Sequence, residues 1–112
     1  MDKASVRYKI YYWKDSLGKS PFLKWLEDLR DVTARARIRV RLDRLERDHL
    51  GDCRSVGSGV HELRMDFGPG YRVYWGILKR EIIVIFEGGT KRTQDQDIES
   101  AKNRRMQLKE KP

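Results

Sequence analysis

The chain has 112 residues, with 25 Lys or Arg against 17 Asp or Glu, so its formal net charge is +8 and its pI is about 9.8. This length allows one domain with a single core and excludes two. We expect residues 1–112 to form that domain, with 106–112 as a frayed tail. No apolar run reaches the roughly 18 residues of a membrane helix, and MDKASVRYKI lacks the apolar segment of a signal peptide. These features predict a cytoplasmic protein with no membrane partner.

The excess of positive charge favours a polyanion or an acidic protein as partner, although a merely soluble basic surface explains it equally well. The cysteine and histidine content gives little support for a metal site or an internal disulfide. Cys53 is the single cysteine and cannot form an internal disulfide, and the two histidines, His49 and His61, have no metal-ligand spacing to it. We therefore expect a free thiol, no metal and no cofactor.

The first half of the chain predicts one strand and two helices. Residues 6–13, VRYKIYYW, alternate and are rich in β-branched and aromatic side chains, as strands are. A helix over 21–30 follows, with Ser20 suited to its N-cap. A second helix begins at an N-cap formed by Asp31 or Thr33. Its apolar stripe, which runs to the end of the helix, is Ile38, Leu42, Leu45 and His49.

The second half predicts a flexible Gly-rich loop over 51–59 and then three strands. These strands are VHELRM (60–65), YRVYWGIL (71–78) and IIVIFE (82–87). Their short connections predict antiparallel neighbours. A polar C-terminal helix then starts at a capping box of Thr93 with Gln96. The order β-α-α-β-β-β-α predicts an α+β fold, with a mostly antiparallel four-stranded sheet and helices packed on one face.

Two arginines are predicted to face each other across the hairpin around Pro69. Side chains alternate along a strand, so a bulge-free turn sets Arg64 opposite Arg72 and Glu62 opposite Tyr74, all on one face. Like charges directly opposite each other are unfavourable. The charge must therefore be offset by acidic neighbours or by a bound ligand.

Two explanations stay open for this pair of arginines. Glu62, Asp66 or Glu87 could form an ion cluster with them, and such networks are common on sheet faces. Alternatively, a phosphate could bind there, held by guanidinium forks. Lys91 and Arg92 follow the last strand and favour the anion site.

Several motifs together resemble the RelE/ParE superfamily of toxin–antitoxin toxins, and most closely its HigB-like branch of addiction-module killer proteins. The motifs are ELR, GPGYRVYW, IIVIFEGGTKRTQ and DIESAK, and the likeness covers residues 8–105. It implies a type II toxin whose partner is an antitoxin with a helix-turn-helix DNA-binding domain. RelE and HigB relatives cleave mRNA on the ribosome, by attack of a ribose 2′-hydroxyl on the adjacent phosphate and without a metal.

The resemblance also implies site residues. Arg72 and Arg64 would stabilise the phosphate, and Lys91 and Arg92 would join them in binding RNA. Glu62 is the best candidate for the general base, because it shares the arginine face, and Tyr74 could orient that base or stack on it.

Other positions depart from the RelE pattern. Val60 and Glu62 stand where RelE-type toxins carry lysines, and Ile98 stands where they carry a tyrosine. No histidine follows His61, and alternation places His61 with the apolar Leu63, as a packed residue. Two alternatives therefore remain: a ParE-like inhibitor of DNA gyrase, or an inactive member that acts only through antitoxin binding and operator corepression.

Overall fold

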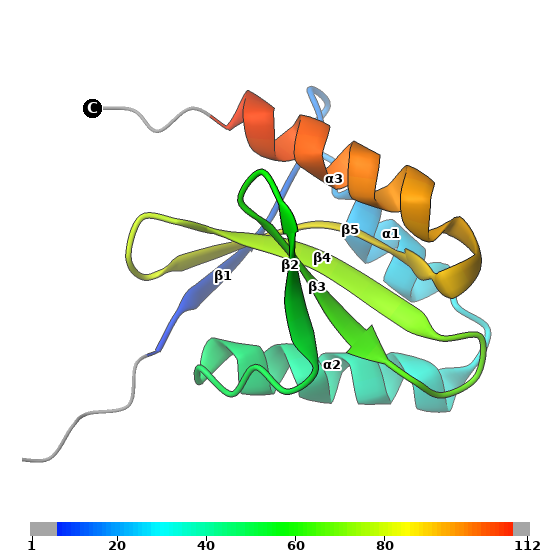
Figure 1. Cartoon of the computed structure of the whole chain (residues 1–112). Helices are drawn as coiled ribbons and strands as arrows, with labels where there is room; N and C mark the ends of the chain where they lie inside the picture. The colour runs from blue at the N-terminus through cyan, green and yellow to red at the C-terminus, as the bar shows by residue number, and fades with distance from the viewer. Residues whose placement is uncertain (1–6, 109–112) are drawn as a thin grey trace, which may run out of the picture.

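The computed structural model describes residues 7–108 and shows an α+β fold with a five-stranded mixed sheet and three α-helices (Figure 1). In chain order, the elements are β1 (Lys9–Tyr12), α1 (Pro21–Asp28), α2 (Val32–Glu46), β2 (Cys53–Gly57), β3 (Val60–Met65), β4 (Tyr71–Leu78), β5 (Ile82–Thr90), the 3-10 helix η1 (Lys91–Thr93) and α3 (Gln94–Gln107). None of these helices is both long and apolar enough to cross a membrane.

The strand order is β1-β5-β4-β3-β2. The three predicted strands form an antiparallel meander, and β1 pairs with β5 in parallel. The predicted α+β class is therefore confirmed, but the sheet has five strands rather than four. The fifth is β2, which pairs antiparallel with β3 where we expected a loop.

The missed strand has a physical explanation. β2 is a short, largely exposed edge strand, so it lacks the apolar alternation that announces a strand. Its hairpin turn uses Ser58 and Gly59, both at positive φ (56° and 78°), as a two-residue hairpin turn requires. The same glycines and serines that suggested flexibility therefore make a tight connection.

Helices cover both faces of the sheet, so the prediction of helices on one face was wrong (Figure 1). The larger core packs α1 and α2 against one face, through residues such as Phe22, Ile38 and Val73. The smaller core packs Ala101 of α3 against the other face, beside Phe86. β4 and β5 are apolar on both sides, so a single layer of helices would leave one apolar face in water.

The ends of α2 follow local signals. The Asp31 carboxylate accepts a hydrogen bond from the backbone N–H of Ala34 at 3.1 Å, which makes Asp31 the N-cap and places Thr33 inside the helix. The helix ends at Glu46, short of the predicted His49, because Asp48 adopts a positive φ of 66°.

The start of α3 differs from the prediction. The Thr93 hydroxyl makes no capping bond to α3; it accepts from the Thr90 backbone N–H and donates to Asp97, so the predicted box with Gln96 does not form. At its other end α3 includes Met106 and Gln107, which we had expected in a frayed tail. The rest of that tail, 109–112, lies outside the described residues.

The hairpin register is the predicted one. Arg64 pairs with Arg72 and Glu62 pairs with Tyr74, across a turn closed by a 3.0 Å hydrogen bond from Gly70 N–H to Phe67 O. Gly70 has φ of 80°, a conformation that suits glycine. The turn residues therefore set which side chains share a face.

Candidate functional site

The candidate site is the face of β3 and β4 on which Glu62, Arg64, Arg72 and Tyr74 lie, and we call it the arginine face. It is the side of the sheet that α3 partly covers, because Gln94 at the start of α3 bonds to Glu62. Two cross-strand rows build it. One row is Arg54, Glu62, Tyr74 and Glu87; the next is Arg64, Arg72 and Gly89.

Glu62 is fully buried and lies at the centre of this face. Its carboxylate accepts hydrogen bonds from Arg54 Nε at 2.9 Å, from the Tyr74 hydroxyl at 3.0 Å and from Gln94 Nε2 at 2.7 Å. These donors come from β2, β4 and α3, so one carboxylate joins three elements. A buried charge is tolerable only with such compensation.

These contacts decide the ionisation of Glu62 and Tyr74. Burial alone would raise the pKa of Glu62, but the hydrogen bonds from Gln94, Arg54 and Tyr74 outweigh it and lower the pKa. Burial and the adjacent Glu62 charge raise the pKa of Tyr74 well above its usual value. Glu62 is therefore an ionised anchor, and Tyr74 is a neutral donor that orients it. Tyr74 is fully buried, so it has no surface on which a nucleobase could stack.

Arg72 is buried and only loosely neutralised. Its side chain is 5% exposed, and its two carboxylate neighbours are distant: Glu62 Oε2 at 4.0 Å and Asp66 Oδ1 at 3.8 Å. One hydrogen bond anchors the guanidinium, from Nη1 to Tyr71 O at 3.1 Å, while Nε has no acceptor among residues 7–108. Arginine has five N–H donors, so Arg72 keeps unused capacity for an anion.

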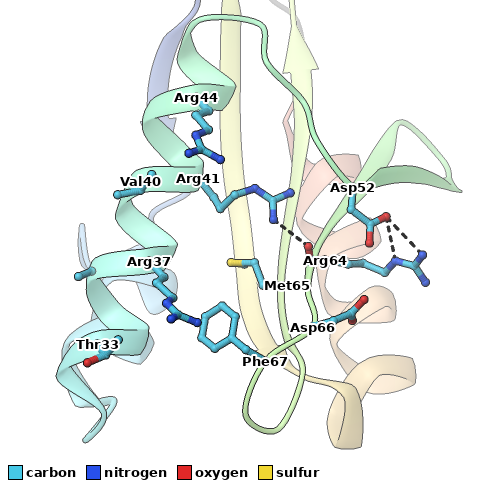
Figure 2. A pocket seen from close by; sticks show the side chains of 11 residues that line it. Thr33, Arg37, Val40, Arg41, Arg44, Asp52, Arg64, Met65, Asp66 and Phe67 are labelled. Carbon is cyan, nitrogen blue, oxygen red and sulfur yellow. Dashed lines mark hydrogen bonds and ion pairs between the residues drawn. The ribbon is translucent and has the colours of Figure 1, made fainter.

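Arg64 is the exposed partner in the cross-strand pair, with 36% of its side chain in solvent. Its guanidinium bonds the Asp52 carboxylate at 3.3 to 3.4 Å, as the dashed lines in Figure 2 show. The ion cluster that the sequence suggested is thus present in part: Glu62 and Asp66 lie near Arg72, and Asp52, which was not a predicted member, pairs with Arg64. Glu87, the third acidic candidate, instead pairs with Arg104 at 2.9 Å.

Lys91 lies beside Arg72, and both are close to Gly70. The Lys91 N–H donates to Gly70 O at 2.7 Å. A Cβ placed on Gly70 would sit 3.3 Å from Lys91 Cβ and 3.4 Å from Arg72 Nη1. Lys91 and Arg92 are both exposed, so the end of the hairpin carries two accessible cations next to a buried one.

Sequence reasoning missed a carboxylate near this site. Asp97 of α3 is hydrogen-bonded by the Thr93 hydroxyl at 2.5 Å and lies against the backbone of Gly89, the β5 partner of Arg72. Burial raises the pKa of Asp97, although Thr93 and Arg104 oppose the shift. The DIESAK motif contained Asp97, but nothing in a polar helix marks which carboxylate faces the sheet. Gln94 and Arg104 of α3 were missed for the same reason, and Arg54 was missed because β2 was not predicted as a strand.

His61 lies away from the arginine face, and a metal site has no support in the described residues. His61 stacks on Trp75 at 4.6 Å, on the opposite side of β3 from Glu62, and burial lowers its pKa. It packs as predicted, away from the arginine face. Within residues 7–108 no three His, Cys, Asp or Glu side chains form a group that could hold a metal ion.

A protein of Haemophilus influenzae with the name "Uncharacterized protein" is similar to this chain. It is 43% identical over 81 residues, which are 72% of this chain and 82% of the relative. The chain belongs to the family of this H. influenzae protein. No protein-family model matches the chain.

Proposed function

We propose that this chain is the toxin of a type II toxin–antitoxin system, from the HigB-like branch of the RelE/ParE superfamily. The motifs from ELR to DIESAK support this assignment. An α+β fold whose central hairpin presents paired arginines is compatible with it. Its partner would be an antitoxin with a helix-turn-helix DNA-binding domain, and it would act in the cytoplasm.

The activity that we propose is cleavage of ribosome-bound mRNA, by attack of a 2′-hydroxyl on the adjacent phosphate. This reaction needs stabilisation of the crowded phosphate and proton transfers, but no metal. The observation that carries the proposal is Arg72, a buried guanidinium whose carboxylate neighbours are 3.8 Å or more away. A phosphate next to Arg72 would supply the close negative charge that Glu62 and Asp66, at 4.0 and 3.8 Å, do not provide.

The residues would divide the work by exposure. Lys91 and Arg92 are exposed and Arg64 is partly exposed, so these three would contact the RNA directly, while Arg72 would act at the edge of the face as a fixed positive charge. Glu62 fits the role of general base poorly, because three donors occupy it and its pKa is lowered. We therefore assign it the positioning of Arg72. Asp97 of α3 lies against Gly89, the β5 residue that pairs with Arg72. Its raised pKa suits proton transfer better than the lowered pKa of Glu62 does.

The state of Glu62 also favours a second candidate function. If no group near Arg72 accepts the proton of the 2′-hydroxyl, the same cationic surface would bind without cleaving. The chain would then be a ParE-like inhibitor of DNA gyrase, or it would act only through its antitoxin and the operator.

The test is growth arrest and mRNA cleavage after induced expression. Wild type is expected to arrest growth and to give codon-phased cuts in primer extension. Arg72→Ala and the exposed double variant Lys91→Ala/Arg92→Ala should each lose at least about tenfold in cleavage, since removing one preorganised charge from a transition state typically costs that much or more. Arg80→Ala, at the opposite end of the meander, is the matched control and should cleave like wild type.

The result also separates the candidates. Trapped gyrase–DNA complexes without mRNA cleavage would support the ParE-like function. If neither mRNA cleavage nor trapped gyrase is seen, the remaining candidate is a corepressor that acts only through its antitoxin and the operator. If Arg72→Ala and Lys91→Ala/Arg92→Ala are both folded by circular dichroism and both cleave like the parent, the proposed phosphate role of the arginine face and of the adjacent cations is wrong.

A further inference from the structure

A second cationic surface lies between α2 and the end of β3, beside the candidate site, with which it shares Arg64. It is a groove of about 640 Å³, and its lining includes Arg37, Val40, Arg41, Arg44, Met65 and Phe67 (Figure 2). The α2 residues among these fall at spacings of three and four, so they form one face of the helix. This face is separate from the stripe of Ile38, Leu42 and Leu45 that packs in the core.

The groove combines an apolar floor with a basic rim. Val40 is 48% exposed on the helix side, and Met65 and Phe67 close the sheet side. A half-exposed valine in a hollow is apolar surface that a partner side chain can cover. An occupant therefore needs an aliphatic or aromatic side chain for the floor.

The rim carries positive charge that the described residues do not neutralise. Arg37, Arg41 and Arg44 have no ion pair with an acidic side chain among residues 7–108. The two aspartates of the groove already face other arginines: Asp52 faces Arg64 and Asp66 faces Arg72. A negatively charged occupant would therefore gain along the α2 side of the rim, where the three arginines lie.

Two of the rim arginines are already held in place, which lowers the entropy cost of binding. Arg41 Nη1 donates to Arg64 O at 2.9 Å, and the Arg37 guanidinium lies 4.8 Å from the centre of the Phe67 ring. Because Arg37 already covers the Phe67 ring, that face is not open for a nucleobase to stack on. A second copy of the chain is disfavoured by its net charge of +8.

We propose that this groove binds an acidic segment of a protein partner, with carboxylates on Arg37, Arg41 and Arg44 and an apolar side chain on Val40. A protein partner can bind here whether or not the chain cleaves RNA, because the groove residues other than Arg64 lie outside the arginine face.

The experiment is selection from a displayed library of random peptides of roughly 15 residues, about four helical turns, on the immobilised full chain. The selected peptides should be acidic and carry at least one aliphatic or aromatic residue. Their affinities are then measured by fluorescence anisotropy. Arg37→Glu/Arg44→Glu should weaken binding at least about tenfold, and Val40→Gln about fivefold.

Arg39→Glu is the matched control, because Arg39 is an exposed arginine of α2 that does not line this groove. It should change affinity less than about twofold. Circular dichroism verifies that each variant folds. The proposal is overturned if the selected peptides are neutral or basic, or if Arg39→Glu weakens them as much as the groove variants do. It is also overturned if a 12-nucleotide RNA, or a second copy seen by light scattering, occupies the groove and no peptide is selected.

Discussion

Glu62 illustrates how burial changes the role of a residue. Its place on the same face as the two arginines made it a candidate base, but burial and three donors make it an anion that holds Arg54, Gln94 and Tyr74 together. A base must have a free lone pair near its substrate. Burial also changes the role of Arg72: its side chain is 5% exposed, so it offers an anion only the edge of its guanidinium and not the open fork that the sequence suggested. Under the proposed function, RNA contact at this face would therefore fall to the more exposed cations around a fixed interior.

Glu62→Gln is predicted to destabilise the protein by about 3 kcal/mol at pH 7, because it removes the buried negative charge near Arg54 and Arg72 and replaces one of its two acceptor oxygens with an NH2 donor. Urea unfolding measures this. The folded pKa of Glu62 is lowered, so its stabilising effect is complete above its unfolded pKa of about 4.3. The effect is lost as the pH falls through the folded pKa. The difference between wild type and Glu62→Gln should thus shrink below about pH 4.

The control for this prediction is Asp28→Asn. Asp28 pairs with Lys24 at 3.1 Å in an exposed i,i+4 contact, with 64% and 79% of the two side chains in solvent. Its loss should cost less than about 0.5 kcal/mol. Equal costs for the two substitutions would mean that the Glu62 network contributes no more than an exposed ion pair.

At the scale of the element, β5 has two adjacent glycines that let helices approach the sheet from both sides. The Trp25 ring of α1 occupies the space where a Cβ of Gly88 would lie, and Asp97 of α3 does the same for Gly89. The alternation of a strand points these two positions to opposite faces. The GG of the GGTK motif is therefore a packing requirement of a strand covered on both sides.

Gly88→Ala is expected to cost about 2 kcal/mol in unfolding free energy, because its Cβ would overlap the Trp25 indole. A double-mutant cycle with Trp25→Leu tests the cause. The smaller side chain should give the new Cβ room, so Gly88→Ala should cost clearly less in the Trp25→Leu background. A cost that does not depend on residue 25 would locate the strain in the backbone instead.

At the scale of the whole molecule, the chain has a net charge of +8, and two of its surfaces cluster cationic side chains. The hairpin end has Arg64, Lys91 and Arg92, and the α2 groove has its own arginine rim. A uniformly basic surface would bind any polyanion in the same way. The groove has apolar side chains beside its arginines and the hairpin end has exposed cations, so the two surfaces can select two classes of ligand.

RNA binding should depend on salt through the hairpin cations. For single-stranded RNA, each phosphate contact contributes roughly 0.7 to the slope of log affinity against log salt. Lys91→Ala/Arg92→Ala should therefore lower the magnitude of that slope by about 1.4. The slope is measured by fluorescence anisotropy with a 12-nucleotide RNA at KCl concentrations from about 50 to about 300 mM. Arg80→Ala should leave it unchanged. An unaltered slope in the double variant would remove both cations from the RNA contact.

The comparison of prediction and structure follows the same scales. The sequence by itself determined the register that pairs Arg64 with Arg72, because alternation and the Gly-Pro-Gly turn are local. The apolar stripe of α2 was equally readable, but the sequence left its cap open between Asp31 and Thr33 and did not indicate that the helix ends at Glu46. β2 escaped because a short polar edge strand has no periodic signal of its own.

Only the tertiary structure decided which charges are buried. Gln94 reaches Glu62 across 32 residues of chain, and α3 packs on the face of the sheet that α1 and α2 leave open. The exposure of Arg72, the saturation of Glu62 and the place of Asp97 all depend on that packing. Alternation along a strand tells which side chains share a face, but solvent access and pKa depend on what distant segments place over that face.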